Sequence, residues 1–136
     1  MKTHTTISLD FYQHLGKLYY AMAAADGNVR EAEINQLKNM VKKEWLAVDD
    51  TDDRFGTDAA YQIEIVFDWL HEEKDYSAKE CYEDFVSFKN DRPQLFTEDI
   101  NRLILKTANA IAESFSGKNK SELMLLAKLQ FELLKK

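Results

Sequence analysis

Apolar residues recur every three or four positions through most of the chain, which is the period of an amphipathic α-helix. The clearest case lies between Ile100 and Phe115. No run of alternating apolar and polar residues is long enough to predict a β-strand. The pattern predicts about six helices, at residues 8–25, 30–45, 58–73, 77–89, 97–115 and 120–136.

The ends of several predicted helices carry recognisable signals. Ser77 and Glu80 match a capping box, in which the side chain of each residue binds the backbone N–H of the other. Thr97 is a typical N-cap for the helix with the clearest period. Pro93 disfavours helix at the residue before it and so separates the fourth helix from the fifth. These signals predict an all-α bundle, which we expect to form a single domain over residues 1–136.

Helical spacing also predicts which side chains point inward. The last helix is apolar on most sides, so we expect it to be largely buried. Tyr20 and Trp69 lie outside the apolar stripes of their helices and are candidates for an exposed patch that binds a partner. His14 follows Asp10 by one helical turn, which predicts a surface ion pair. The expected core includes Leu15, Leu18, Tyr19, Met22, Ile34, Leu37, Met40, Val41, Trp45, Ile63, Val66, Phe67, Leu70, Ala78, Cys81, Tyr82, Phe85, Phe88, Ile100, Leu103, Ile104, Thr107, Ala108, Ile111 and Phe115.

One short stretch, residues 21–34, is rich in alanine and joins the first predicted helix to the second. Gly27 has no Cβ and can adopt the left-handed conformation that commonly ends a helix. Glu33 follows Arg30 by three residues and can accept a backbone N–H at the start of the next helix. The small alanines allow two helix backbones to approach closely. The stretch therefore predicts a compact helix–turn–helix corner.

The same pattern recurs 89 positions later without a gap. In the second copy Asn119 and Glu122 form the capping box. Two such corners predict two pseudo-symmetric helix pairs that share one core, with chance similarity between two amphipathic helix pairs as the alternative. The aligned pairs are Ala21 with Ala110, Ala23 with Ala112, Glu33 with Glu122 and Leu37 with Leu126.

Composition is that of an ordinary globular protein, with 45% apolar and 31% charged residues. A chain of 136 residues can bury a substantial core. The single cysteine, Cys81, excludes an internal disulfide and fits a reducing compartment. The N-terminus lacks the layout of a signal peptide, and no apolar run approaches the length of a membrane span. We therefore expect a cytoplasmic protein that does not insert into membranes.

The net charge of −6 is unevenly distributed along the chain. Residues 44–75 hold eleven acidic and two basic side chains, a net charge of −9, so the remainder carries +3. Binding to phosphates requires clustered Lys and Arg, so this balance argues against nucleic acid as a partner. The acidic region is either a solvated face that keeps the protein soluble or a surface that attracts a cation or a basic protein.

A family resemblance rests on the residues that begin at Ala23, which read Ala-Ala-Ala-Asp-Gly-Asn-Val-Arg-Glu-Ala-Glu-Ile. This block resembles the first half of a TerB-like domain, the helical module of the tellurite-resistance family that is also attached to some J-domain co-chaperones. The family pattern is Ala-Asp-Gly, an aliphatic residue, a cap and then Glu, in two copies. The second copy here retains Glu122 but has Phe-Ser-Gly at residues 115–117 in place of Asp-Gly. The first copy matches at Asp26, Gly27, Val29 and Glu33.

The resemblance implies an all-helical, non-enzymatic module with a role in a stress response and with divalent-cation binding through acidic residues. The residues point the same way, because Asp26 lies at a helix end where the helix dipole disfavours a carboxylate. We therefore predict a weak site for calcium, magnesium or manganese, with carboxylate oxygens as ligands. The alternative is that Asp26 is a turn residue and the glutamates only cap helices. The candidate ligands are Asp26, Glu33, Glu113 and Glu122.

Other candidate sites are weaker. The acidic run from Asp49 to Gly56 lacks the glycine and glutamate positions of a calcium loop. Cys81 lies on an apolar helix face, which favours a structural thiol over a nucleophile. Four polar side chains share a face of the third helix, but one helix supplies no closed site, so a solvated face is favoured over an active site. These four are Glu64, Asp68, His71 and Asp75.

The sequence thus predicts a protein that is not an enzyme. The leading hypothesis is a TerB-like module that binds a divalent cation through the acidic residues at its corners. The alternative is a metal-free protein–protein interaction module, co-chaperone-like or a scaffold, with an unidentified protein partner.

Overall fold

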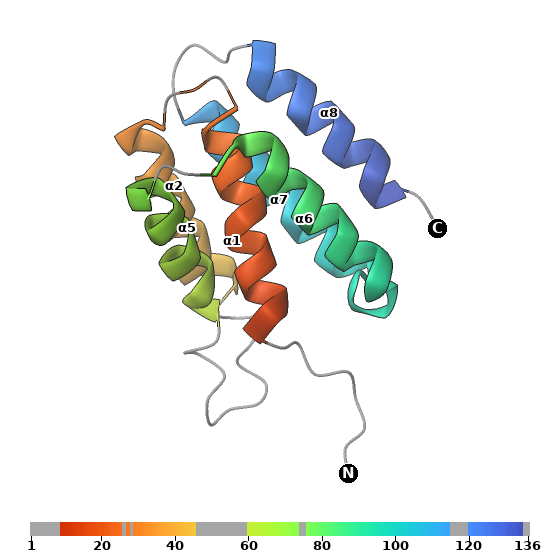
Figure 1. Cartoon of the computed structure of the whole chain (residues 1–136). Helices are drawn as coiled ribbons and strands as arrows, with labels where there is room; N and C mark the ends of the chain where they lie inside the picture. Colours follow the sequence, from red (N-terminus) through yellow and green to blue (C-terminus); the bar gives the residue numbers. More distant parts are fainter. Residues whose placement is uncertain are drawn as a thin grey trace.

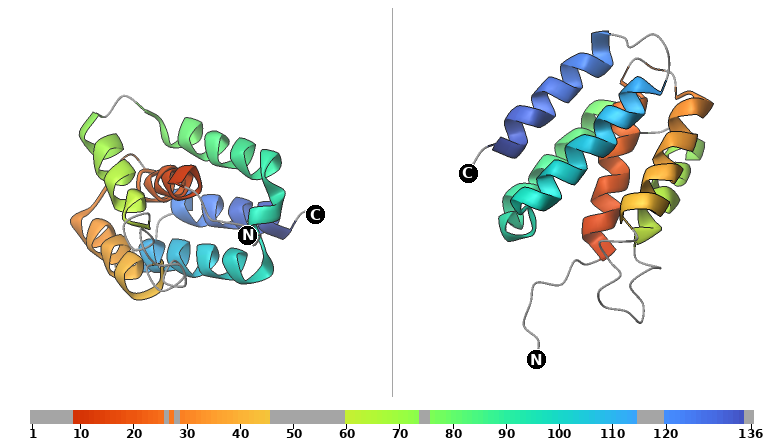
Figure 2. Two further views of the ribbon diagram at one scale, coloured as in Figure 1. Left: turned by 90° about the horizontal axis from the view of Figure 1, so that it is seen from below. Right: turned by 180° about the vertical axis from the view of Figure 1, so that it is seen from behind.

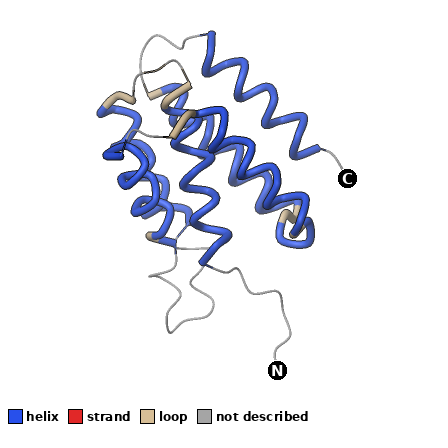
Figure 3. Tube along the Cα trace, in the orientation of Figure 1, coloured by secondary structure: helices blue, strands red, loops and turns tan. Residues whose placement is uncertain are grey.

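The computed structural model describes residues 9–25, 27, 29–45, 60–73, 76–114 and 120–134. Within these ranges the chain forms six α-helices and no strand, which confirms the predicted all-α bundle (Figures 1 and 3). α2 continues into a π-helical turn, Val41–Trp45, and a short 3-10 helix, Pro93–Leu95, lies between α6 and α7. The α-helices are α1 (Leu9–Ala23), α2 (Glu31–Met40), α5 (Gln62–Glu73), α6 (Ala78–Asp91), α7 (Glu98–Glu113) and α8 (Lys120–Leu134).

The predicted signals at the helix ends are confirmed where the structure describes them. The hydroxyl of Ser77 accepts the backbone N–H of Glu80 at 3.0 Å, and the carboxylate of Glu80 accepts the N–H of Ser77 at 3.4 Å. The hydroxyl of Thr97 accepts the N–H of Ile100 at 3.2 Å at the start of α7. These bonds satisfy backbone donors that have no partner inside the helix.

α1 is the central helix of the bundle. It contacts every other described helix, and ten of its fifteen residues are buried. Seen from below in Figure 2, α2 and α5 lie on one side of α1, with α6, α7 and α8 on the other. Gly16 allows the closest approach, because a Cβ at this position would lie 2.9 Å from the carbonyl oxygen of Ile63 in α5. A helix that is apolar on nearly all sides is therefore surrounded by the others.

Most of the predicted core is confirmed. Ile34, Val66, Ala78, Tyr82 and Leu103 are only partly buried, and Phe115 lies outside the described residues. The other predicted core side chains are buried. Trp45 is completely buried, and its indole N–H donates to the hydroxyl of Thr107 at 3.0 Å. The helical period therefore identified the inward face of α2, α5, α6 and α7.

Two predictions on α1 are wrong. Tyr20 is buried and packs edge-to-face on Phe67, with ring centroids 5.8 Å apart, because the central position of α1 leaves this side covered by α5. His14 does not pair with the carboxylate of Asp10. Its ring stacks on Phe88 at 4.3 Å, and its Nδ1 lies 2.7 Å from the backbone carbonyl oxygen of Asp10. The carboxylate of Asp10 lies 3.3 Å from the guanidinium of Arg92.

The prediction for α8 is also wrong. Four of its large apolar side chains, Leu123, Met124, Phe131 and Leu134, are exposed. α8 packs on α1 and α7 at one edge of the bundle, so one side of the helix has no neighbour among the described helices (Figure 1). None of the described helices is long and apolar enough to cross a membrane.

Candidate functional site

The two predicted corners lie at the same end of the bundle, at the top of Figure 1, where α2 and α8 begin. At the first corner Gly27 has a φ of +89°, which confirms the predicted left-handed turn. The N–H of Gly27 donates to the carbonyl oxygen of Ala24 at 2.9 Å and closes the turn after α1. The candidate ligand Asp26 lies outside the described residues, as do residues 115–119 of the second corner.

Glu33 caps the start of α2 as predicted. Its Oε1 accepts the backbone N–H of Arg30 at 2.9 Å, and its own N–H donates to the carbonyl oxygen of Arg30 at 2.9 Å. The guanidinium of Arg30 also lies 4.0 Å from Oε2 of Glu33. These contacts fix the carboxyl of Glu33 on the inner side of the first turn.

Glu33 meets Glu122, the residue at the matching position of the second corner. Both side chains are completely buried, and their carboxyls are close enough for Glu122 to raise the pKa of Glu33. Two ionised carboxylates in a buried site repel each other, so burial of the pair favours a proton on one of the two. Burial and then the contact with Glu122 raise the pKa of Glu33 to about 8, although the N–H of Arg30 favours its charged form. The pair of Glu33 and Glu122 therefore holds one proton at neutral pH.

Glu113, the other candidate ligand on α7, occupies a different place. It is the last residue of the helix and is exposed. Its side chain lines a shallow hollow of about 530 Å³, opposite Asn35 and Gln36 of α2. Glu113 is thus near α2 on the outer surface, whereas Glu33 points into the protein.

The buried pair supplies ligand atoms of the type that hard divalent cations bind. Carboxylate oxygens are the ligands that calcium, magnesium and manganese prefer. The number of ligands is low, since the part of the chain that the structure describes contains no group of three or more His, Cys, Asp or Glu side chains that could hold a metal ion. The nearby guanidinium of Arg30 opposes a cation by charge repulsion. A cation at Glu33 and Glu122 would therefore need additional oxygen ligands.

Among the weaker candidates, Cys81 is buried as predicted, whereas Glu64 and His71 on the predicted solvated face of α5 are only partly exposed. Burial raises the pKa of the Cys81 thiol to about 11, so it is not a reactive thiolate. On the acidic face of α5, the carboxylate of Asp68 lies 3.6 Å from the ammonium of Lys38. Asp75 and the run from Asp49 to Gly56 lie outside the described residues.

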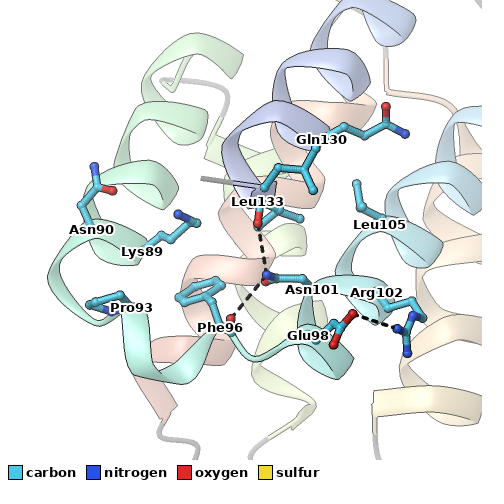
Figure 4. A pocket seen from close by; sticks show the side chains of 11 residues that line it. Lys89, Asn90, Pro93, Phe96, Glu98, Asn101, Arg102, Leu105, Gln130 and Leu133 are labelled. Carbon is cyan, nitrogen blue, oxygen red and sulfur yellow. Dashed lines mark hydrogen bonds and ion pairs between the residues drawn. The ribbon is translucent and has the colours of Figure 1, made fainter. Parts of the chain in front are cut away.

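A groove between α6, α7 and α8, with a volume of about 820 Å³, was not predicted from the sequence. Figure 4 shows Asn101 at its floor, where the side-chain amide donates to the backbone carbonyls of Phe96 at 3.4 Å and Leu133 at 3.3 Å. Beside it the ammonium of Lys89 lies 3.5 Å from the carboxylate of Glu132, and both side chains are buried. These contacts attach the end of α8 to α6 and α7.

Comparisons with family models, with curated proteins and with solved structures find no match for this chain. The resemblance to the TerB-like family therefore stays a prediction, carried by the residues around the first corner and by Glu122.

Proposed function

We propose that this chain is a non-enzymatic, TerB-like module of the cytoplasm that binds a divalent cation through Glu33 and Glu122 and acts in a stress response. The observation that carries the proposal is the meeting of these two carboxyls at the starts of α2 and α8. Glutamate is almost never fully buried, and two carboxyls buried in contact share a costly site. A cation would neutralise both and replace the proton.

The proton held by the buried pair makes cation binding depend on pH. Because burial and Glu122 hold the pKa of Glu33 near 8, a cation that binds at neutral pH must displace this proton. Binding should therefore release a proton below this pH, and the affinity should increase as the pH rises toward it. A cation that binds only to surface carboxylates would show neither effect.

The test is a titration of the full chain with calcium, magnesium or manganese, followed by the melting temperature. We expect a cation to raise the melting temperature of the wild type, more strongly above pH 8 than below it. Glu33→Gln and Glu122→Gln each remove a charged ligand and should abolish the response. Glu31→Gln is the matched control, because Glu31 is exposed in the same first turn of α2, and it should retain the response.

Two results would contradict the proposal. A wild type that responds to none of the three cations has no site of this kind. A response that survives both glutamine substitutions shows that the cation binds elsewhere. Either result favours the alternative, a metal-free protein–protein interaction module.

One observation supports that alternative directly. Trp69 is 47% exposed on α5, as the sequence predicts, and its ring lies 5.3 Å from that of Tyr76. Exposed aromatic pairs of this kind are common at protein interfaces. A protein-binding role and a cation site are compatible, because Trp69 and Tyr76 are exposed whereas Glu33 and Glu122 are buried.

A further inference from the structure

The outer side of α8 carries a continuous apolar surface. Phe131 and Leu134 are 71% and 74% exposed, and Met124 is 58% exposed. The spacing from Met124 through Ala127 and Phe131 to Leu134 is three, four and three residues, so these side chains share one face of the helix. We call Leu123, Met124, Ala127, Phe131 and Leu134 the α8 surface.

The exposed charges on α8 are all positive. The helix contains four charged residues, of which Lys120 and Lys128 are exposed while Glu122 and Glu132 are buried. The α8 surface is therefore an apolar stripe accompanied by basic side chains, on a protein whose net charge is −6.

A second apolar surface lies on α5 and has the opposite charge. Ile65 is 54% exposed, and together with Trp69 and Tyr76 it forms what we call the α5 surface. The acidic side chains of Glu72 and Glu73 are exposed on the same side of the helix, which contains no Lys or Arg, while the carboxylate of Asp68 there is paired with Lys38 of α2. Large apolar side chains surrounded by charge are typical of sites that bind another protein.

We propose that the α8 surface of one copy of this chain docks on the α5 surface of a second copy. The basic side chains beside the first surface complement the acidic side chains around the second, and both surfaces present large apolar groups along a helix. α5 and α8 lie on opposite sides of α1 in all three views, so their surfaces cannot pair within one chain (Figures 1 and 2). This inference does not depend on the cation site.

The charges argue against the simpler symmetric arrangements. An α8 surface that paired with its own copy would bring Lys120 and Lys128 near the same lysines of the partner. An α5 surface paired with itself would bring Glu72 and Glu73 together. Like charges on facing helices repel, so the mixed arrangement is favoured over both.

The mixed arrangement has a consequence for assembly size. A docked pair retains one unused surface of each kind, so association continues into rings or chains rather than stopping at a dimer. A contact made by one helix on each side is smaller than the roughly 800 Å² per partner of a stable interface. We therefore expect weak assembly that depends on protein concentration.

The first test is sedimentation of the full chain over about a hundredfold range of concentration, since weak interfaces populate assemblies only at high concentration. The mean mass should rise above that of one chain. Phe131→Ser and Trp69→Ser should each lower the association constant by about tenfold or more, as the loss of an aromatic anchor does. Leu9→Ser is the control, because Leu9 is 53% exposed but belongs to neither surface, and it should associate like the wild type.

The second test exchanges charges between the surfaces. Lys128→Glu and Glu72→Lys should each weaken association, whereas an equal mixture of the two variants should restore it, because each contact then joins opposite charges. A symmetric α8 contact would instead be insensitive to Glu72→Lys. The proposal is overturned if the wild type stays monomeric throughout, if Phe131→Ser associates normally, or if the mixture is no stronger than its components. Circular dichroism confirms that each variant is folded.

Discussion

The buried acid pair makes protein stability depend on pH in a way that one substitution removes. Glu33→Gln replaces the carboxyl by an amide of the same shape, whose oxygen can still accept the backbone N–H of Arg30. The amide N–H can face Glu122 in place of the O–H of a protonated carboxyl. The variant therefore imitates the wild type at low pH but cannot lose a proton.

The size of the effect follows from the pKa of Glu33, which is about 8 in the folded protein against an ordinary value of 4.5. Between these values the folded protein holds a proton that the unfolded chain has released. The free energy of unfolding then falls as the pH rises, by about 1.4 kcal/mol per pH unit. The loss begins above pH 4.5 and is complete above about 8. Across two pH units inside this window it amounts to about 2–3 kcal/mol.

The assay is urea unfolding of both proteins at a series of pH values without divalent cations. The difference in unfolding free energy between Glu33→Gln and the wild type should grow with pH and level off above about 8. Glu122→Gln should keep part of the slope, because burial, the larger cause of the raised pKa, remains. Glu31→Gln, in an exposed position, should follow the wild type. Parallel curves for Glu33→Gln and the wild type would show that Glu33 holds no proton in this range.

Two further predictions concern the turn before α2 and the buried hydrogen bond between Trp45 and Thr107. Gly27→Val should lower the free energy of unfolding by about 1–2 kcal/mol, because a β-branched residue is strained at a φ of +89°, and an unchanged melting temperature would contradict this. Thr107→Val should cost about 1–3 kcal/mol in urea unfolding, since the buried indole N–H of Trp45 loses its acceptor. Thr107→Ser retains the hydroxyl and should cost less than Thr107→Val.

The helices and most of the core were predictable because they depend on local information. A helical period shows which side chains share a face, and capping residues such as Ser77 and Thr97 mark where a helix begins. The wrong predictions of burial arose because the number of neighbours around a helix is not visible in its own sequence. Tyr20 is buried because α1 is central, whereas Phe131 is exposed because α8 is at an edge. Periodicity alone does not distinguish these two positions.

At the candidate site, too, local sequence predicted some features, whereas others depend on how the helices pack. The spacing from Arg30 to Glu33 predicted the cap, and the repeat placed Glu122 at the matching position. Capping glutamates usually lie on the surface, so the local pattern gave no signal that both carboxyls would be buried and in contact. That contact depends on the packing of α2, α7 and α8, which brings together residues 89 positions apart.

The buried polar contacts also explain which face of α8 is buried. A helix that is apolar on most sides could pack on the bundle in several rotations about its own axis, because each would bury apolar area. The structure buries Glu122 beside Glu33 at one end of α8, and Glu132 beside Lys89 near the other. Any other rotation would expose these carboxyls and leave Lys89 buried without its partner, which is strongly unfavourable. The two polar contacts therefore favour one rotation, and the same rotation directs the apolar side chains of the α8 surface outward.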